Sequence, residues 1–200
     1  MKKLITITGC TSSGKTFIQD AVVRVNDNIS KIVSTTSRPI RVNEKEGIDY
    51  YYISRSKAIE MLDFNEFIEL RKYEVIDLEG NNTWYYGISK EEVLNNKSDI
   101  AITIVDEQGR QALKKYCKDN NIKMVSYYIS CSYKTLLQRS LLREGNIPDV
   151  KVLEMCRRLQ SDYEIVEIAK QDKDIILLDN ETQQDFVNAV LRIAEVGGNE

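Results

Sequence analysis

The sequence predicts an α/β fold in which a parallel five-stranded sheet is flanked by helices. Apolar, β-branched segments alternate with amphipathic helical segments along the 200 residues. The run LITIT at residues 4–8 lies between lysines and a glycine, which is typical of a buried parallel strand. A glycine-rich loop follows this strand directly and leads into a helix, so the first βα turn is a candidate ligand site.

The remaining elements follow the same alternation. After a helix over 15–25, the other four strands of the sheet are expected over 31–36, 99–106, 123–130 and 174–178. Further helices are expected over 108–119, 133–143, 149–170 and 182–194. Apolar residues of the 149–170 helix step by three and four, so this stripe is expected to face the core: Leu153, Cys156, Leu159, Tyr163 and Val166.

Residues 49–88 interrupt the alternation. Strand patterns at 49–54, 66–76 and 84–88 predict a small strand-rich insert within a single domain. Immediately afterwards, Ser89-Lys90-Glu91-Glu92 has the pattern of a capping box, which predicts the start of a short helix.

Composition excludes several classes of function. With 42% hydrophobic residues the chain can form one core, and a net charge of −3 argues against a nucleic-acid partner. The sequence has no histidine, which excludes Ser-His-Asp and Cys-His nucleophiles and HExxH zinc chemistry. Phosphoryl transfer stays open, because it depends mainly on positioning and charge neutralisation.

Cysteine spacing and apolar runs indicate the compartment. Four scattered cysteines without a CxxC pair suit free thiols in a reducing environment. Every apolar run is too short for a membrane span, so we expect a cytoplasmic protein without a membrane partner.

The strongest motif is GCTSSGKT at residues 9–16, which matches GxxxxGK[ST] between the first strand and the first helix. In this motif backbone N–H groups surround phosphate oxygens, and the helix N-terminus adds partial positive charge. We expect Lys15 to reach the β- and γ-phosphates of ATP and the Thr16 hydroxyl to bind Mg²⁺. The complete set of expected ATP contacts is Gly9, Thr11, Ser12, Ser13, Gly14, Lys15 and Thr16.

The next segment, STTSRPIR at 34–41 with Glu44, Gly47, Asp49 and Tyr50, resembles a motif of the guanylate kinase family. Forked guanidinium groups suit the phosphate of an acceptor nucleotide. The resemblance implies that Arg38, Arg41 and Tyr50 hold that phosphate and that Ser34 lies near the base. Ser37 and the early proline depart slightly from the family pattern.

Two further segments resemble the base-binding motifs of that family, NEFIE at 65–69 and YYG at 85–87. The resemblance implies that Glu69 reads guanine and that Tyr86 contacts the acceptor. A carboxylate can accept from guanine N1–H and N2–H₂, whereas adenine N1 would repel it. Ile88 stands where the family has Ser or Thr, and the 70–84 segment is longer than usual, so an altered acceptor base stays open.

The family's remaining charged motifs also have counterparts. DEQG at 106–109 resembles I-D-x-Q-G, which implies that Asp106 binds the acceptor and, with Thr16, Mg²⁺; Ile104 replaces a second acid. The resemblance implies that Arg139, Arg143 and Arg158 are lid arginines that, with Lys15, stabilise the transferring phosphoryl group. Asp179-Asn180 reverses the order of a family pair and assigns no role.

The resemblance implies a P-loop nucleoside-monophosphate (NMP) kinase fold. Its core would span residues 1–33, 90–130 and 165–200, with an NMP-binding insert over about 34–89 and a helical lid over about 138–158. The implied reaction is in-line transfer from ATP, with Mg²⁺, to GMP or dGMP by a monomer or homodimer. The alternatives are an NMP kinase of altered base specificity, a non-catalytic guanylate-kinase-like binding module, and a related sugar-phosphate kinase.

Overall fold

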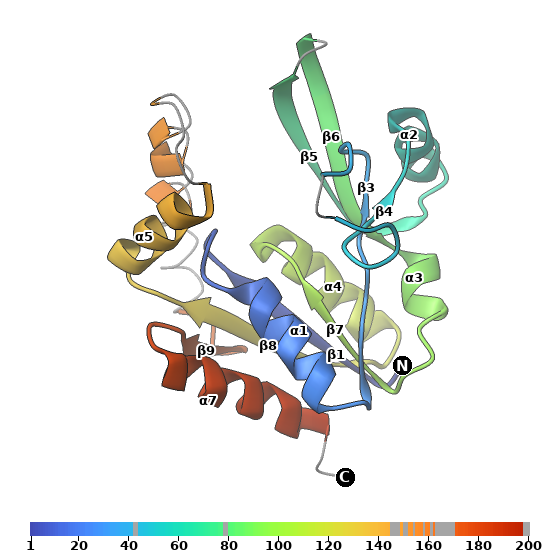
Figure 1. The fold of residues 1–200 in the computed structure, drawn as a ribbon. Helices are drawn as coiled ribbons and strands as arrows, with labels where there is room; N and C mark the ends of the chain where they lie inside the picture. The colour runs from blue at the N-terminus through green and yellow to red at the C-terminus, as the bar shows by residue number, and fades with distance from the viewer. Residues whose placement is uncertain are drawn as a thin grey trace.

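The computed structural model describes residues 1–41, 44–77, 80–144, 149, 152–153, 155–157, 159–160, 162 and 171–197. Its first sheet has five parallel strands in the order β2-β7-β1-β8-β9, as the sequence predicts (Figure 1). Their bounds are β1 Lys3–Gly9, β2 Ile29–Lys31, β7 Ile100–Ile104, β8 Lys123–Ser130 and β9 Ile175–Asp179.

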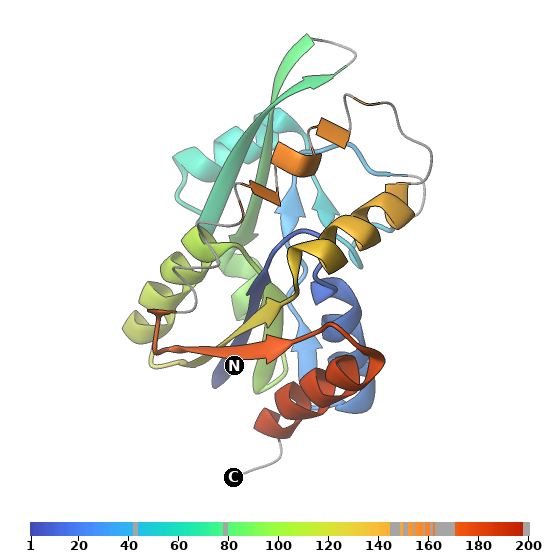
Figure 2. The same cartoon turned by 90° about the vertical axis from the view of Figure 1, so that its left-hand side faces the viewer.

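Helices cover both faces of this sheet (Figure 2). One face, which includes Ile5 and Ile7 of β1, packs against α1 (Lys15–Val25) and α7 (Gln183–Ala194). The other face, which includes Leu4, packs against α3 (Lys90–Leu94) and α4 (Glu107–Asp119). Strand side chains alternate between faces, so both faces of β1 are buried, and Thr6 and Thr8 are buried together with its apolar residues. Helix α5 (Tyr133–Glu144) follows β8, and the short η1 (Glu195–Gly197) follows α7.

A second sheet stands beside the carboxyl ends of the first, in the order β4-β3-β6-β5 (Figure 1). It contains β3 (Thr35–Thr36), β4 (Tyr51–Tyr52), β5 (Phe67–Asp77) and β6 (Gly80–Ser89), and α2 (Arg55–Asp63) packs beside it. The predicted strands at 66–76 and 84–88 correspond to β5 and β6. These two form a long antiparallel hairpin that extends away from the first sheet.

Three predictions of local structure were wrong. The strand predicted over 31–36 is two strands, because the chain leaves the first sheet after Ile32 N donates to Ile102 O and enters the second sheet at Thr35. The 49–54 strand shortens to β4, and helix α2 follows, which the strand pattern did not reveal. Its start is capped by Ser54 Oγ, which accepts from Lys57 N.

The third error concerns the predicted core-facing stripe of the 149–170 helix. Of the predicted stripe, Leu159 is buried as expected, whereas Leu153 is 68% exposed and Cys156 is exposed; Met155, which lies outside the stripe, is buried. The buried face of the described helical residues therefore coincides only in part with the predicted one. The predicted stripe residues Tyr163 and Val166 lie outside the described part of the chain.

Other local predictions are confirmed. Ser89 and Glu92 form the predicted capping box at the start of α3, and all four cysteines are free. Within the described part of the chain, no helix is both long and apolar enough to cross a bilayer.

Candidate active site

The glycine-rich loop connects the carboxyl end of β1 to the start of α1, where a parallel sheet positions ligands. Gly14 has φ +91°, and a Cβ there would lie 2.5 Å from Asn180 Nδ2, so both the backbone angle and the neighbour require glycine. Asn180 is buried and donates from Nδ2 to Ser13 O at 2.7 Å. The loop is therefore held from the end of β9 as well as by its own backbone.

Lys15 lies across the inside of this loop. Its Nζ donates to Gly9 O at 2.8 Å and to Cys10 O at 2.7 Å. Burial lowers the pKa of Lys15, and the nearby carboxylate of Asp162 opposes that shift. The same carboxylate accepts from Thr11 N at 2.9 Å, which is a type of backbone donor that phosphate oxygens use in such loops.

Helix α5 contacts the loop through polar side chains. Ser140 Oγ donates to Ser12 Oγ at 2.8 Å, and Arg139 Nη2 donates to Asn180 O at 2.8 Å. Arg143 is exposed in the last turn of α5. Although the burial of Lys15 is the larger cause, the charge of Arg143 also lowers the pKa of Lys15. The predicted lid residue Arg158 lies outside the described residues.

Arg38, one of the predicted phosphate-binding arginines, is only 4% exposed. Its Nη2 donates to both carboxylate oxygens of Glu44, at 2.8 and 2.9 Å, and its Nη1 donates to Pro39 O at 2.7 Å. Burial opposes the charge of Arg38, but Glu44 raises its pKa overall. Its guanidinium also lies 5.6 Å from the ring centre of Tyr50 and 5.9 Å from that of Tyr52.

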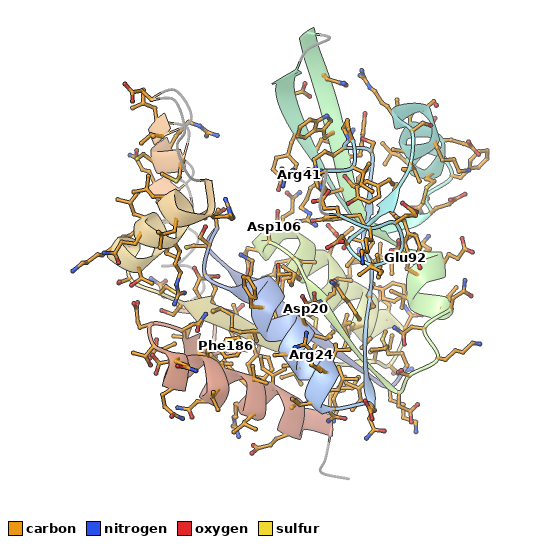
Figure 3. All side chains as sticks on the ribbon, in the orientation of Figure 1. Asp20, Arg24, Arg41, Glu92, Asp106 and Phe186 are labelled. Atoms are coloured by element: carbon orange, nitrogen blue, oxygen red, sulfur yellow. The ribbon has the colours of Figure 1, made fainter. Side chains whose placement is uncertain are left out.

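Glu44 connects several residues around Arg38. Besides Arg38, it accepts from Tyr52 Oη at 2.8 Å and from Arg41 N at 2.9 Å. The Arg41 side chain is exposed, and Figure 3 places it on the flank of the second sheet that faces α5. Arg38 is therefore fixed by a carboxylate, whereas Arg41 is held through its backbone.

An aromatic row leads from Arg38 towards the β5–β6 hairpin. The ring of Tyr50 lies 5.9 Å from that of Tyr86, edge to face, and Tyr73 lies 5.4 Å from Tyr86. Ser34 is half-buried, and its backbone carbonyl accepts from Tyr51 N. The structure thus groups Tyr50 and Tyr86 with Arg38.

Glu69 lies further along the same hairpin, with its side chain 1% exposed. Arg71 donates to it twice, from Nε to Oε2 and from Nη2 to Oε1, each at 3.2 Å. Arg71 Nη1 lies 3.7 Å from Asp106 Oδ2. Asp106 caps α4, because its Oδ1 accepts from Gly109 N at 2.8 Å, and Figure 3 shows it at the top of that helix.

Ile88 pairs directly with Glu69 across the hairpin and is fully buried in the core that contains α3 and α4. Next to it, a Cβ on Gly87 would lie 2.6 Å from Glu69 O, so the close approach of β5 and β6 requires glycine there. Ile88 therefore supplies apolar packing beside a buried carboxylate.

Comparison with known proteins agrees with this arrangement. A family model described as Guanylate kinase matches residues 1–195. The chain belongs to the guanylate kinase family. It is 28% identical over 188 residues to a guanylate kinase of Chlamydia felis (strain Fe/C-56), covering 92% of this chain and 83% of that relative. It is 29% identical over 194 residues to one from Thermotoga maritima, covering 96% and 85%.

The fold agrees as well. The crystal structure of guanylate kinase from Anaplasma phagocytophilum superimposes with a TM-score of 0.65 at 21% identity, covering 98% of this chain and 84% of that one. The predicted P-loop NMP-kinase fold is confirmed. As a guanylate kinase family member, the protein is a nucleoside-monophosphate kinase.

The sequence did not predict the roles of four residues of the site. Glu44 was present in the recognised motif, but nothing in the sequence identified it as the partner of Arg38. Arg71 follows Glu69 by two residues, which in a strand places both on one face, and this was the available signal. Asn180 belongs to the reversed family pair, to which the sequence assigned no role, and Asp162 lies in no recognised motif; both reach the glycine-rich loop from distant parts of the chain.

Proposed function

We propose that this guanylate kinase family member transfers the γ-phosphate of ATP to GMP or dGMP by direct in-line displacement. The observation that carries the proposal is the buried carboxylate of Glu69 on β5, together with the buried guanidinium of Arg38 two residues after β3 of the same sheet. One group suits the N–H edge of guanine and the other suits a monophosphate. The aromatic row between them offers surfaces along the length of a nucleotide.

On the donor side, the loop of residues 9–16 would bind the ATP phosphates. Lys15 would exchange its two carbonyl partners for phosphate oxygens and neutralise the charge that develops during transfer. Arg139 and Arg143 project from α5, which is joined to the loop, so they would add positive charge from the other side. Arg158 would contribute in the same way from the proposed lid.

On the acceptor side, Arg38, Arg41 and Tyr50 would hold the monophosphate, with Ser34 and Tyr86 nearby. Glu44 fixes the direction of the Arg38 fork, so less side-chain entropy is lost when phosphate binds. Such positioning converts a bimolecular encounter into an oriented transfer, and no side-chain base is required.

Mg²⁺ fits one of the two predicted ligands better than the other. Thr16 is exposed at the first turn of α1, where its hydroxyl can join phosphate oxygens and water around the ion. Asp106 has one oxygen on Gly109 N and the other near Arg71, so its carboxylate faces the acceptor side. Bound with ATP, the ion would neutralise charge on the β- and γ-phosphates.

The two sheets suggest a division of labour. We propose that residues of about 34–89 form the acceptor-binding insert and that about 138–158 form a lid, on a core of 1–33, 90–130 and 165–200. Two contacts support this proposal: Ser140 donates to Ser12 of the 9–16 loop, and Arg139 donates to Asn180, which in turn contacts Ser13 of that loop.

The test is an ADP-release assay with MgATP and a panel of ribo- and deoxynucleoside monophosphates. Turnover with GMP or dGMP well above that with AMP and CMP is expected. Turnover with a different nucleotide alone would retain the kinase and overturn the guanine assignment. Absence of turnover across the panel would overturn the proposed function.

A further inference from the structure

The acceptor end of the second sheet contains one charged residue, Arg71, that the reaction as proposed above does not use. We define the base-edge cluster as Glu69, Arg71 and Asp106. Arg71 lies between the two carboxylates, 3.2 Å from each oxygen of Glu69 and 3.7 Å from Asp106 Oδ2. A Cβ on Gly109 would lie 3.0 Å from Glu69 Oε2, so the cluster sits against the first turn of α4.

Burial of these charged side chains carries a desolvation cost, so the cluster contributes little net stability to the fold. The side chains of Glu69 and Arg71 are 1% and 16% exposed, and desolvation of such a pair offsets much of its attraction. Burial raises the pKa of Glu69, Asp106 raises it further, and the charge of Arg71 opposes both. Arg71 therefore favours the ionised form of the carboxylate that would face the base.

The fork of Arg71 is only partly used by Glu69. Its Nε and Nη2 donate to Glu69, its Nη1 is beyond normal hydrogen-bond distance of Asp106, and the Tyr73 hydroxyl is a further polar neighbour of the guanidinium. Arg71 and Tyr86 are paired across the hairpin, so the guanidinium lies beside the aromatic row that leads to Arg38. A nucleotide with its phosphate at Arg38 would extend its base towards both Arg71 and Glu69.

We propose that Arg71 is a specificity-determining residue that donates to the carbonyl of the acceptor base while Glu69 accepts from the adjacent ring N–H. A donor next to an acceptor selects a lactam edge, C=O beside N–H, as in guanine and hypoxanthine. Arginine is the usual partner of guanine O6 in nucleic-acid recognition. Adenine presents an amino group and an unprotonated ring nitrogen at these positions, so both protein groups would be mispaired.

This inference rests on the proposed function and makes it more specific. The Ile88 side chain has no hydroxyl to donate to the base, and Arg71 supplies a donor on the same face of the hairpin. Because both oxygens of Glu69 already accept from Arg71, the exocyclic amine of guanine contributes less than the lactam edge. IMP, which has the lactam edge but lacks that amine, is therefore expected to bind within about tenfold of GMP.

The experiment is calorimetric binding of GMP, IMP and AMP to the full chain without ATP, so that it does not depend on turnover. Arg71→Met removes the donors and keeps the length, and Arg71→Lys keeps the charge without the fork. Lys72→Met is the matched control, because Lys72 is the adjacent cation on the other face of β5, over the ring of Tyr85. Melting temperatures of all variants report whether each is folded.

We expect Arg71→Met to weaken the binding of GMP and IMP about 10- to 100-fold and to leave the binding of AMP nearly unchanged. The ratio of the affinities for GMP and AMP should therefore fall by the same factor. Arg71→Lys should restore part of that ratio, and Lys72→Met should leave it at the wild-type value. A 2-aminopurine nucleotide, which lacks O6, should lose no further affinity on Arg71→Met, because the contact is already absent.

Different failures have different meanings. An Arg71→Met protein that binds GMP as tightly as the wild type, or more tightly, would overturn the assignment and identify Arg71 as a neutralising or blocking group. If Arg71→Met does not fold, an unchanged GMP/AMP ratio in a folded Arg71→Lys protein would overturn it equally. A wild-type protein that binds none of the nucleotides would instead overturn the proposed function.

Discussion

The glycine-rich loop and the proposed acceptor side of this kinase are built by different means. The loop at residues 9–16 is a backbone structure, in which a left-handed glycine, a helix start and one lysine create a site for anions. The acceptor side is made of side-chain ion pairs, Arg38 with Glu44 and Arg71 with Glu69, on a small sheet. A backbone site depends on a few local residues, whereas a side-chain site depends on partners that must all be correct.

The largest expected effect is on the ATP loop. Lys15→Ala removes the one side-chain cation inside the loop, and turnover should fall by about 10³-fold or more, as for other residues that stabilise transition-state charge. Nucleotide acceptor binding should persist, because Lys15 contacts only the loop carbonyls in the described structure. ADP release and GMP calorimetry measure the two effects. Lys57→Ala, at an exposed side chain of α2, is the control, and substantial turnover by Lys15→Ala would contradict the proposed role of Lys15.

Substitution of either residue of the Arg38–Glu44 ion pair should weaken binding of the acceptor nucleotide. Arg38→Met removes a charged donor and should raise the KM for the monophosphate about 100-fold, whereas Glu44→Gln should raise it about tenfold by releasing the guanidinium. The KM for ATP should stay near the wild-type value in both. If the acceptor KM is unchanged in Arg38→Met, the buried pair is structural and the phosphate lies elsewhere.

A smaller effect is expected from loss of the hydrogen bond between Asn180 and Ser13 of the loop. Asn180→Asp replaces the Nδ2 donor to Ser13 O with an acceptor, and an unpaired buried acceptor costs about 1–3 kcal/mol. The KM for ATP should rise about tenfold while the acceptor KM does not. Asn188→Asp on the exposed side of α7 is the matched control. Equal changes in both KM values would show that the two regions are not independent.

This contrast explains what could be predicted from the sequence. Gly14, Lys15 and Thr16 follow a strand and begin a helix within a few residues, so local pattern was enough to predict the loop and its α/β context. Four of the five parallel strands followed from apolar runs of the same kind. In contrast, the break after Ile32 and the start of α2 depend on where the second sheet stands, which no local pattern contains.

The ion pairs could not be predicted for a related reason. Glu69 was recognisable from its motif, and Arg71 lies two residues later on the same face of β5, but no local pattern shows that this face is buried against the first turn of α4. Likewise Asn180 meets Gly14 across 166 positions of sequence, and only the packing of β9 beside β8 brings them together. Long side chains find partners in three dimensions, so residue type alone does not identify them.

The smallest expected effect on catalysis lies where the two regions join. Glu92 of α3 accepts from Thr35 of β3 and from Ser89 N, and Figure 3 shows it at the base of the second sheet. Burial raises the pKa of Glu92 to about 7, its hydrogen bonds with Thr35 and Ser89 oppose this, and the charge of Glu69 adds to it. The Glu92 carboxyl belongs to the capping box of α3, so we expect its protonation to affect the stability of the fold and to have little effect on turnover.

The sign follows from the raised pKa. The folded state holds this proton more tightly than the unfolded chain, whose pKa is near 4.5, so the free energy of unfolding falls as pH rises from about 4.5 to about 7. Each pKa unit corresponds to about 1.4 kcal/mol, and because Glu92 is only partly buried we expect a decrease of about 2 kcal/mol. Glu92→Gln should remove that decrease and leave turnover near wild type, whereas Glu91→Gln, an exposed neighbour, should retain it. Urea unfolding at pH 5, 6 and 7.5 measures the difference. If the free energies of unfolding of the wild type and Glu92→Gln change in parallel with pH, the Glu92 carboxyl does not titrate in this range.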